Sequence, residues 1–81
     1  MLYPKEAEIV NILRGAVAYS NLYNLIAIRT RINEMLLSNG HPYVCSTSIG
    51  LQLTETNSIE FSYYIESIDP QYEHISGVMI I

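Results

Sequence analysis

The chain has 81 residues, of which 49% are hydrophobic and 15% are charged, and its formal net charge is −4. An acidic balance has the wrong sign for binding to phosphates, so we expect no nucleic acid partner. One cysteine and two histidines exclude an internal disulfide and a zinc site made of Cys and His alone, and we expect no cofactor and no metal.

A chain of this length is expected to form a single domain, 1–81, with a small core. Domains of this size usually need a disulfide, a metal or a partner subunit for stability, and the first two are not expected here. The charged fraction is also low beside the roughly 25% of typical globular chains. We therefore expect apolar surface to be covered by another chain, which predicts a homo-oligomer.

Two features of the N-terminal half bear on the cellular compartment. Lys5, Glu6 and Glu8 stand where the apolar core of a signal peptide would begin. The longest uncharged stretch of this half, residues 15–28, is too short and too polar to span a bilayer. The sequence therefore predicts a cytoplasmic protein that does not bind membranes.

The first predicted element is helical and covers residues 4–38. Pro4 suits the first turn of a helix, and Glu6 and Glu8 suit its positive end. The sequence SNGHP at 38–42 combines a candidate for the left-handed position after a helix with a following proline. We expect the helix to end there.

The apolar stripe of this helical region changes sides between residues 19 and 27. At 100° per residue, one broad face holds Ile9, Ile12, Leu13, Ala16, Val17, Tyr19, Tyr23 and Ala27. A roughly opposite face holds Leu22, Leu25, Ile28, Ile32 and Leu36. Either one long helix buries opposite faces at its two ends, or two helices are joined by a turn at YSNLYN.

We favour the continuous or gently bent helix, because this segment contains neither glycine nor proline. In the two-helix alternative, Ser20 or Asn21 would cap the second helix. A continuous helix would be a rod of roughly 50 Å that leaves its second face to another subunit. This predicts self-association through Leu22, Leu25, Ile28, Ile32 and Leu36.

Residues 43–81 are predicted to form a three-stranded antiparallel meander. Residues 43–53 and 59–65 alternate apolar and polar side chains with period two, which is typical of strands with one buried face. TETN at 54–57 is a candidate hairpin loop, and DP at 69–70 indicates the next turn. A third strand within 73–81 completes an α+β fold, with the helical region on one face of the sheet.

We predict no catalytic and no metal site. A Cys–His pair needs a direct hydrogen bond, but His41 and Cys45 would lie roughly 13 Å apart on an extended segment. Cys45 falls on the apolar face of its strand, where cysteine acts as a small hydrophobic residue. One group matches no metal-binding spacing and is expected to form a solvated turn: Glu66, Asp69, Glu73 and His74.

Seven tyrosines are the unusual count in this composition. Tyr19, Tyr23 and Tyr63 follow predicted core faces. Tyr64 points the other way, beside Glu60 and Glu66, and tyrosine suits contact surfaces because it is both stiff and amphipathic. These three residues are the predicted contacts with another protein.

The function that we expect is a non-enzymatic protein-interaction module that is homo-oligomeric and acts as an inhibitor or adaptor. Its size and acidic balance fit a protein encoded by a phage or mobile element. One alternative is a binder of nucleotides or other anions at a subunit boundary, through Arg29, Arg31 and Tyr23. On a helix the two arginines point about 200° apart, so they cannot easily grip one anion together. They can equally be interpreted as ordinary surface arginines. A structural subunit of a larger assembly is the other alternative.

Overall fold

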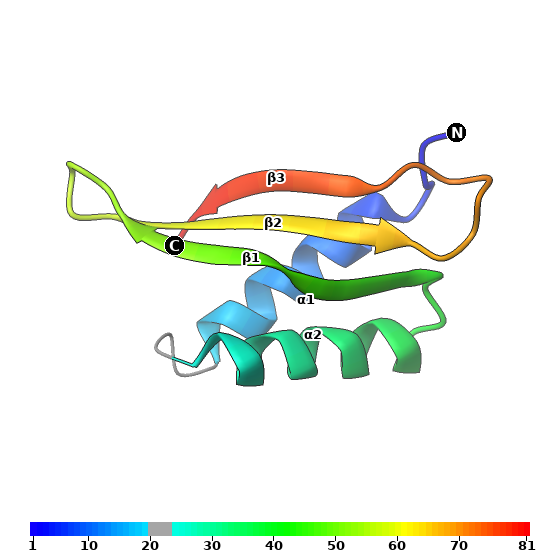
Figure 1. Ribbon diagram of the computed structural model, residues 1–81, viewed down its shortest axis with the longest axis horizontal. Helices are drawn as coiled ribbons and strands as arrows, with labels where there is room; N and C mark the ends of the chain where they lie inside the picture. The colour runs from blue at the N-terminus through cyan, green and yellow to red at the C-terminus, as the bar shows by residue number, and fades with distance from the viewer. Residues whose placement is uncertain (20–23) are drawn as a thin grey trace.

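In the computed structural model, two helices lie against one face of an antiparallel three-stranded sheet (Figure 1). The elements are α1 (Glu6–Ala18), α2 (Leu25–Ser38), β1 (Tyr43–Leu53), β2 (Ile59–Ser67) and β3 (Ile75–Ile80). The structure describes residues 1–19 and 24–81, except for the side chains of residues 47 and 48. The predicted α+β fold with a β-meander is confirmed.

The helical region consists of two helices, so the two-helix alternative is confirmed and the favoured continuous helix is wrong. α1 ends at Ala18, and the N–H of Tyr19 still bonds to the carbonyl of Gly15 at 3.1 Å. α2 begins at Leu25, and the side chain of Asn24 accepts a hydrogen bond from the N–H of Ala27 at 3.0 Å. Asn24 is therefore the N-cap. Ser20 and Asn21, the expected caps, lie outside the described residues.

The break between the helices explains why the apolar stripe changes sides. α2 turns back and packs on the core that is formed by α1 and the sheet. Ile28, Ile32 and Leu36 are fully buried within the chain. The ground for predicting self-association through these three residues is thereby removed, since the face is already covered. The whole core comprises Ile9, Leu13, Ala16, Val17, Ile28, Ile32, Leu36, Tyr43, Cys45, Phe61, Ile65, Ile75 and Met79.

The end of α2 follows the predicted stop signal. Gly40 adopts a positive φ of 72°, the left-handed conformation that glycine tolerates best. The N–H of His41 bonds to the carbonyl of Leu36 at 3.0 Å, and the N–H of Gly40 bonds to that of Leu37 at 3.1 Å. These two bonds form the Schellman motif, which satisfies carbonyls at the end of the helix and directs the chain into β1.

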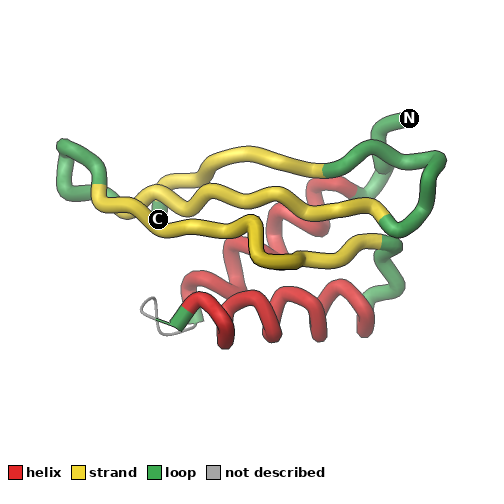
Figure 2. The backbone as a smooth tube through the Cα atoms, viewed as in Figure 1, coloured by secondary structure: helices red, strands yellow, loops and turns green. Residues whose placement is uncertain are grey.

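The sheet has the order β1-β2-β3, and both pairs are antiparallel. The ladder of β2 and β3 is regular, whereas β1 has a register shift between Cys45 and Ile49. Residues 43–45 and 49–53 of β1 therefore pair with β2 as two separate segments, and Figure 2 shows the step between them. The insertion preserves the alternation, so that odd-numbered residues of β2, of β3 and of the two paired segments of β1 face the helices.

The N-terminal segment is held by a cluster of aromatic rings. The ring of Tyr3 lies 5.0 Å from that of Tyr43 and 4.9 Å from that of Tyr72, and both pairs are edge-to-face. The Tyr3 hydroxyl is 2.8 Å from Nδ1 of the buried His41, whose Nε2 is 3.3 Å from the Glu8 carboxylate. This cluster joins the N-terminus and α1 to the start of β1 and to the β2–β3 connection.

No helix within the described residues is long and apolar enough to cross a membrane.

Candidate binding sites

The first candidate site is the face of the sheet that the helices leave uncovered, which we call the outer sheet face. It is formed by the even-numbered residues of the three strands, because successive side chains in a strand point to opposite sides. Its described members are Val44, Ser46, Gly50, Gln52, Glu60, Ser62, Tyr64, Glu66, Ser76, Val78 and Ile80.

Apolar and aromatic side chains on the outer sheet face are open to solvent. Val78 and Ile80 are each 56% exposed, and Tyr64 is 37% exposed. The ring of Tyr64 lies 5.3 Å from that of His74, and Nδ1 of His74 accepts a hydrogen bond from the N–H of Ser67 at 2.9 Å. This contact orients the histidine beside Tyr64 at one end of the face.

The outer sheet face is also acidic, and the residues paired with its two glutamates carry no positive charge. Glu60 is paired across the strands with Gln52 and Ile80, and Glu66 is paired with Val44. Glu66 accepts a 3.3 Å hydrogen bond from the Ser46 hydroxyl, which leaves its charge intact.

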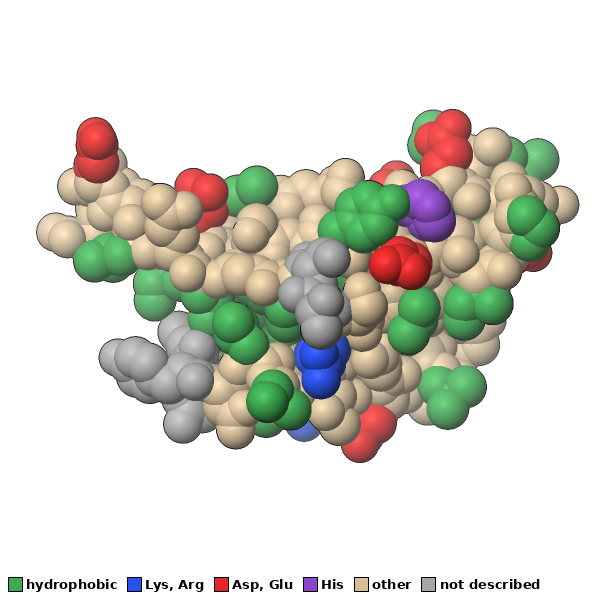
Figure 3. Space-filling model, viewed as in Figure 1, with side chains coloured by type: hydrophobic (Ala, Val, Ile, Leu, Met, Phe, Trp, Pro, Cys, Tyr) green, Lys and Arg blue, Asp and Glu red, His purple; other side chains and the backbone are tan. Residues whose placement is uncertain are grey.

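The basic side chains all belong to the helical half of the chain, which also contains Glu6, Glu8 and Glu34. Lys5, Arg14, Arg29 and Arg31, the four basic residues of the chain, all precede the sheet. Residues 43–81 contain five carboxylates, of which Glu60 and Glu66 lie within strands. Figure 3 shows the blue side chains over the helical layer, and red ones both along the sheet and on the helical layer. A partner approaching the outer sheet face therefore meets negative potential.

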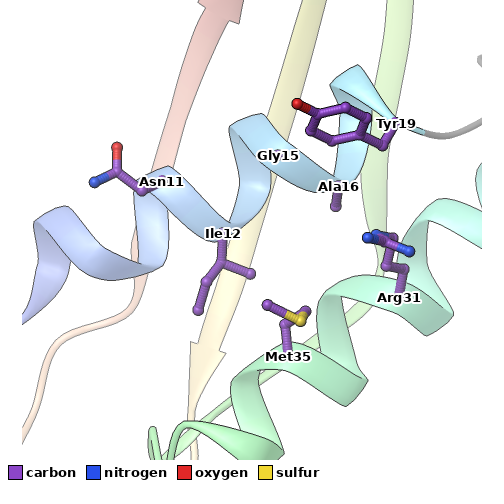
Figure 4. Close-up of a pocket in the computed structure, with 7 residues that line it drawn as sticks. All are labelled: Asn11, Ile12, Gly15, Ala16, Tyr19, Arg31 and Met35. Carbon is purple, nitrogen blue, oxygen red and sulfur yellow. The ribbon is translucent and has the colours of Figure 1, made fainter.

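The second candidate site is a groove of about 330 Å³ between the two helices, which we call the interhelical groove. It is lined by Asn11, Ile12, Gly15, Ala16, Tyr19, Arg31 and Met35. In Figure 4, Ile12 and Met35 point toward each other, and Arg31 reaches from α2 toward α1. The lining thus combines an apolar floor with one guanidinium and one phenol ring.

Arg31 has no carboxylate within 4.0 Å in the part of the chain that the structure describes. Tyr19, at the end of α1, is 83% exposed, so its predicted place in the core is wrong. Gly15 lies within α1, and a Cβ added there would meet nothing within 4 Å. Packing inside the chain therefore does not require a glycine at this position.

The structure brings some predicted site residues together and separates others. Tyr64, Glu60 and Glu66 share the outer sheet face, as the period-two pattern predicts. Arg31 lines the groove, whereas Arg29 is half-buried and its charge acts on the Cys45 thiol at the sheet side of α2. Leu22 and Tyr23 lie outside the described residues, and Leu25 is 36% exposed at the start of α2.

Sequence reasoning missed several residues of these sites. Val78 and Ile80 belong to the outer sheet face on β3. The sequence could have identified them, because they alternate with Ile75 and Met79, which face the core. Tyr19 and Met35 belong to the groove, which depends on how α1 crosses α2. No periodicity within one helix contains that information.

Cys45 is unsuited to nucleophilic chemistry. Its side chain is buried, and this burial raises the pKa of the thiol from 9.0 to about 11, while the smaller effect of the Arg29 charge is to lower it. A thiol is a nucleophile only as the thiolate, which burial disfavours. His41, its suggested partner in a dyad, is engaged by Tyr3 and Glu8 instead.

Among residues 1–19 and 24–81, no group of three or more His, Cys, Asp or Glu side chains is arranged to hold a metal ion. Comparisons with protein-family models, with curated proteins and with solved structures find no match to this chain.

Proposed function

We propose that this protein is a non-enzymatic protein-interaction module that acts as an inhibitor or adaptor in the cytoplasm, where a lone unpaired cysteine is ordinary. Its outer sheet face binds a partner protein that presents cationic side chains around an apolar strip. One observation carries the proposal: exposed Tyr64, Val78 and Ile80 lie among the carboxylates of Glu60 and Glu66, and residues 43–81 contain no lysine or arginine.

The chemistry of the face selects this class of partner. Tyrosine and aliphatic anchors release water when they are covered, and they dominate the energy of many interfaces. Acidic groups around such anchors favour a basic partner and disfavour an acidic one. Two copies of this chain packed face to face would bring Glu60 and Glu66 of both copies together, so this face is suited to a different protein.

The test uses two synthetic amphipathic peptides as probes, one with lysine and one with glutamate on the polar side. We expect the lysine peptide to shift the NMR signals of outer-face amides, and Tyr64→Ala to weaken its binding by about tenfold. Glu60→Lys should weaken binding of the lysine peptide and permit binding of the glutamate peptide. Added salt should weaken the binding of the lysine peptide to the wild type and of the glutamate peptide to Glu60→Lys.

Glu55→Lys is the matched control, because it makes the same change of charge at the hairpin tip, away from the face. It should leave the affinity for the lysine peptide nearly unchanged. Equal losses for Glu55→Lys and Glu60→Lys would show an effect of net charge alone, and the proposal would fail. It would also fail if the lysine peptide shifted no outer-face signal.

The interhelical groove supports a second candidate function, the binding of a small organic anion that carries an aromatic or apolar body. Arg31 can pair with a carboxylate or phosphate, and the Tyr19 ring and the floor of Ile12 and Met35 can cover the apolar part. This candidate keeps the predicted role of Arg31. It replaces a subunit boundary with a groove inside one chain.

A thermal-shift screen with nucleotides and aromatic carboxylates tests the groove. A ligand at a hundred times its dissociation constant would add about 2.7 kcal/mol to the free energy of unfolding. Arg31→Gln should abolish the thermal shift. Arg14→Gln should preserve it, because Arg14 is exposed on α1 and does not line the interhelical groove. Gly15→Ala should stabilise the unliganded protein by about 1 kcal/mol, because alanine favours a helix more than glycine does. It should also lower the affinity for the ligand, because the added methyl group occupies space in the groove. A shift that survives Arg31→Gln would refute this candidate.

A further inference from the structure

β3 is an edge strand with a regular backbone. It pairs with β2 through six consecutive residues, from Ile75 opposite Ile65 to Ile80 opposite Glu60. No strand lies on its other side in the described part of the chain. Such an edge presents unpaired N–H and C=O groups, which can pair with a further strand.

The groups that point outward from β3 follow from the ladder. The N–H of Ile81 bonds to the carbonyl of Ile59 at 2.8 Å. Because hydrogen-bonded residues alternate along an antiparallel strand, odd-numbered residues of β3 bond to β2. The backbone N–H and C=O groups of Ser76, Val78 and Ile80 therefore point away from the sheet.

The edge of β3 lacks the features that protect most edges. Its sequence ISGVMI has no charged residue and no proline, and its register has no bulge. The opposite edge, on β1, is protected: it is interrupted by a bulge, and α2 runs beside it (Figure 1). The Asn33 side chain occupies the outward groups of Cys45 there, with both bonds at 2.7 Å.

We infer that β3 is the interface with a second copy of this chain, through antiparallel pairing about a two-fold axis at Val78. In this register Val78 lies opposite Val78 of the second copy, and Ser76 lies opposite Ile80. Every outward N–H and C=O group of these three residues then has a partner. The inference goes beyond the proposed function and does not rest on it, because it concerns the edge of the sheet.

A second copy fits this edge better than an unrelated strand for two reasons. The two-fold axis places Val78 opposite Val78 and exchanges Ser76 with Ile80. The edge is therefore complementary to its own copy, as an isologous interface requires. The chain has a net charge of −4, but β3 has no charged residue, so like charges do not meet at the new pairing. Each protected β1 edge lies at an outer end of the joined sheet, so assembly stops at the dimer.

The test is the solution mass, measured by light scattering after size exclusion, of the wild type, Val78→Lys and Val78→Glu. The wild type should have twice the 9.2 kDa mass of one chain. Each variant alone should be monomeric, because like charges directly opposite each other destabilise a strand pair. An equimolar mixture of the two variants should recover the dimer mass. This recovery requires that residue 78 faces residue 78.

Ser62→Lys is the matched control, because Ser62 is the exposed neighbour of Val78 on β2 and lies one strand away from the edge. It should remain dimeric. Val78→Pro is a second variant that removes an outward N–H without removing a bond to β2, and it should also be monomeric. Circular dichroism confirms that each variant is folded, as expected for a side chain that is 56% exposed.

A monomeric wild type overturns the inference. So does a wild-type dimer that persists in Val78→Lys and Val78→Pro, since another surface then holds it together. Monomeric variants whose mixture stays monomeric would overturn the register at Val78.

Discussion

At the scale of single residues, burial decides what each reactive or aromatic side chain of this protein can do. Cys45 and Tyr19 show the two directions of this effect. Cys45 is enclosed beneath α2, and its thiol is held in the neutral form. Tyr19 continues an apolar stripe but lies past the last residue of α1, so its ring is exposed at the groove.

The buried thiol predicts slow alkylation and loss of stability at alkaline pH. With a pKa near 11 rather than 9.0, the thiolate fraction at neutral pH is about a hundredfold lower than that of a free thiol. Iodoacetamide should label the folded protein far more slowly than the protein in urea. Labelling at equal rates in both states would contradict the burial of Cys45.

The sign of the pH effect follows from linkage. A pKa raised by folding gives stability that is present below pH 9.0 and is lost as the pH rises toward 11. Burial also raises the pKa values of Tyr3 and Tyr43, which add to the loss at higher pH. The free energy of unfolding in urea should therefore fall across this range, and it should fall less in Cys45→Ala.

At the scale of elements, the caps determine where the helices begin and end. The stop after α2 is local, because Gly40 and the two bonds of the Schellman motif lie within a few residues. It was therefore readable in the sequence. The start of α2 was not, because YSNLYN contains two asparagines and a serine, each of which is a good cap.

The N-cap of α2 makes a testable contribution to stability. Asn24→Ala removes the acceptor for the N–H of Ala27 and should lower the free energy of unfolding by about 1 kcal/mol. Asn24→Asp retains an acceptor at the same position and should lose much less. Chemical denaturation followed by circular dichroism measures both. Equal losses would show that α2 begins elsewhere.

At the scale of the whole molecule, the two layers differ in charge and in what covers them. The helical layer contains all four basic residues, and the sheet layer is acidic. Pairing of two β3 edges would join two outer sheet faces into one continuous surface. A partner with two cationic segments would then bind both copies at once, with higher avidity than either face alone provides.

Much of the fold followed from the sequence by itself. Period-two alternation predicted the strands and placed Tyr64, Glu60 and Glu66 on one face, because side-chain direction in a strand depends only on position along it. Helical periodicity identified both apolar faces of residues 4–38. Composition excluded an internal disulfide, because the chain has only one cysteine.

The tertiary structure alone decided which apolar face is covered by the chain itself. Periodicity shows that Ile28, Ile32 and Leu36 must be buried, but it does not show against what. A break of a few residues lets α2 turn back, and the chain then supplies the cover that a straight helix would need from a partner. The groove and the open edge of β3 likewise depend on contacts between distant segments, so neither is encoded in any local pattern.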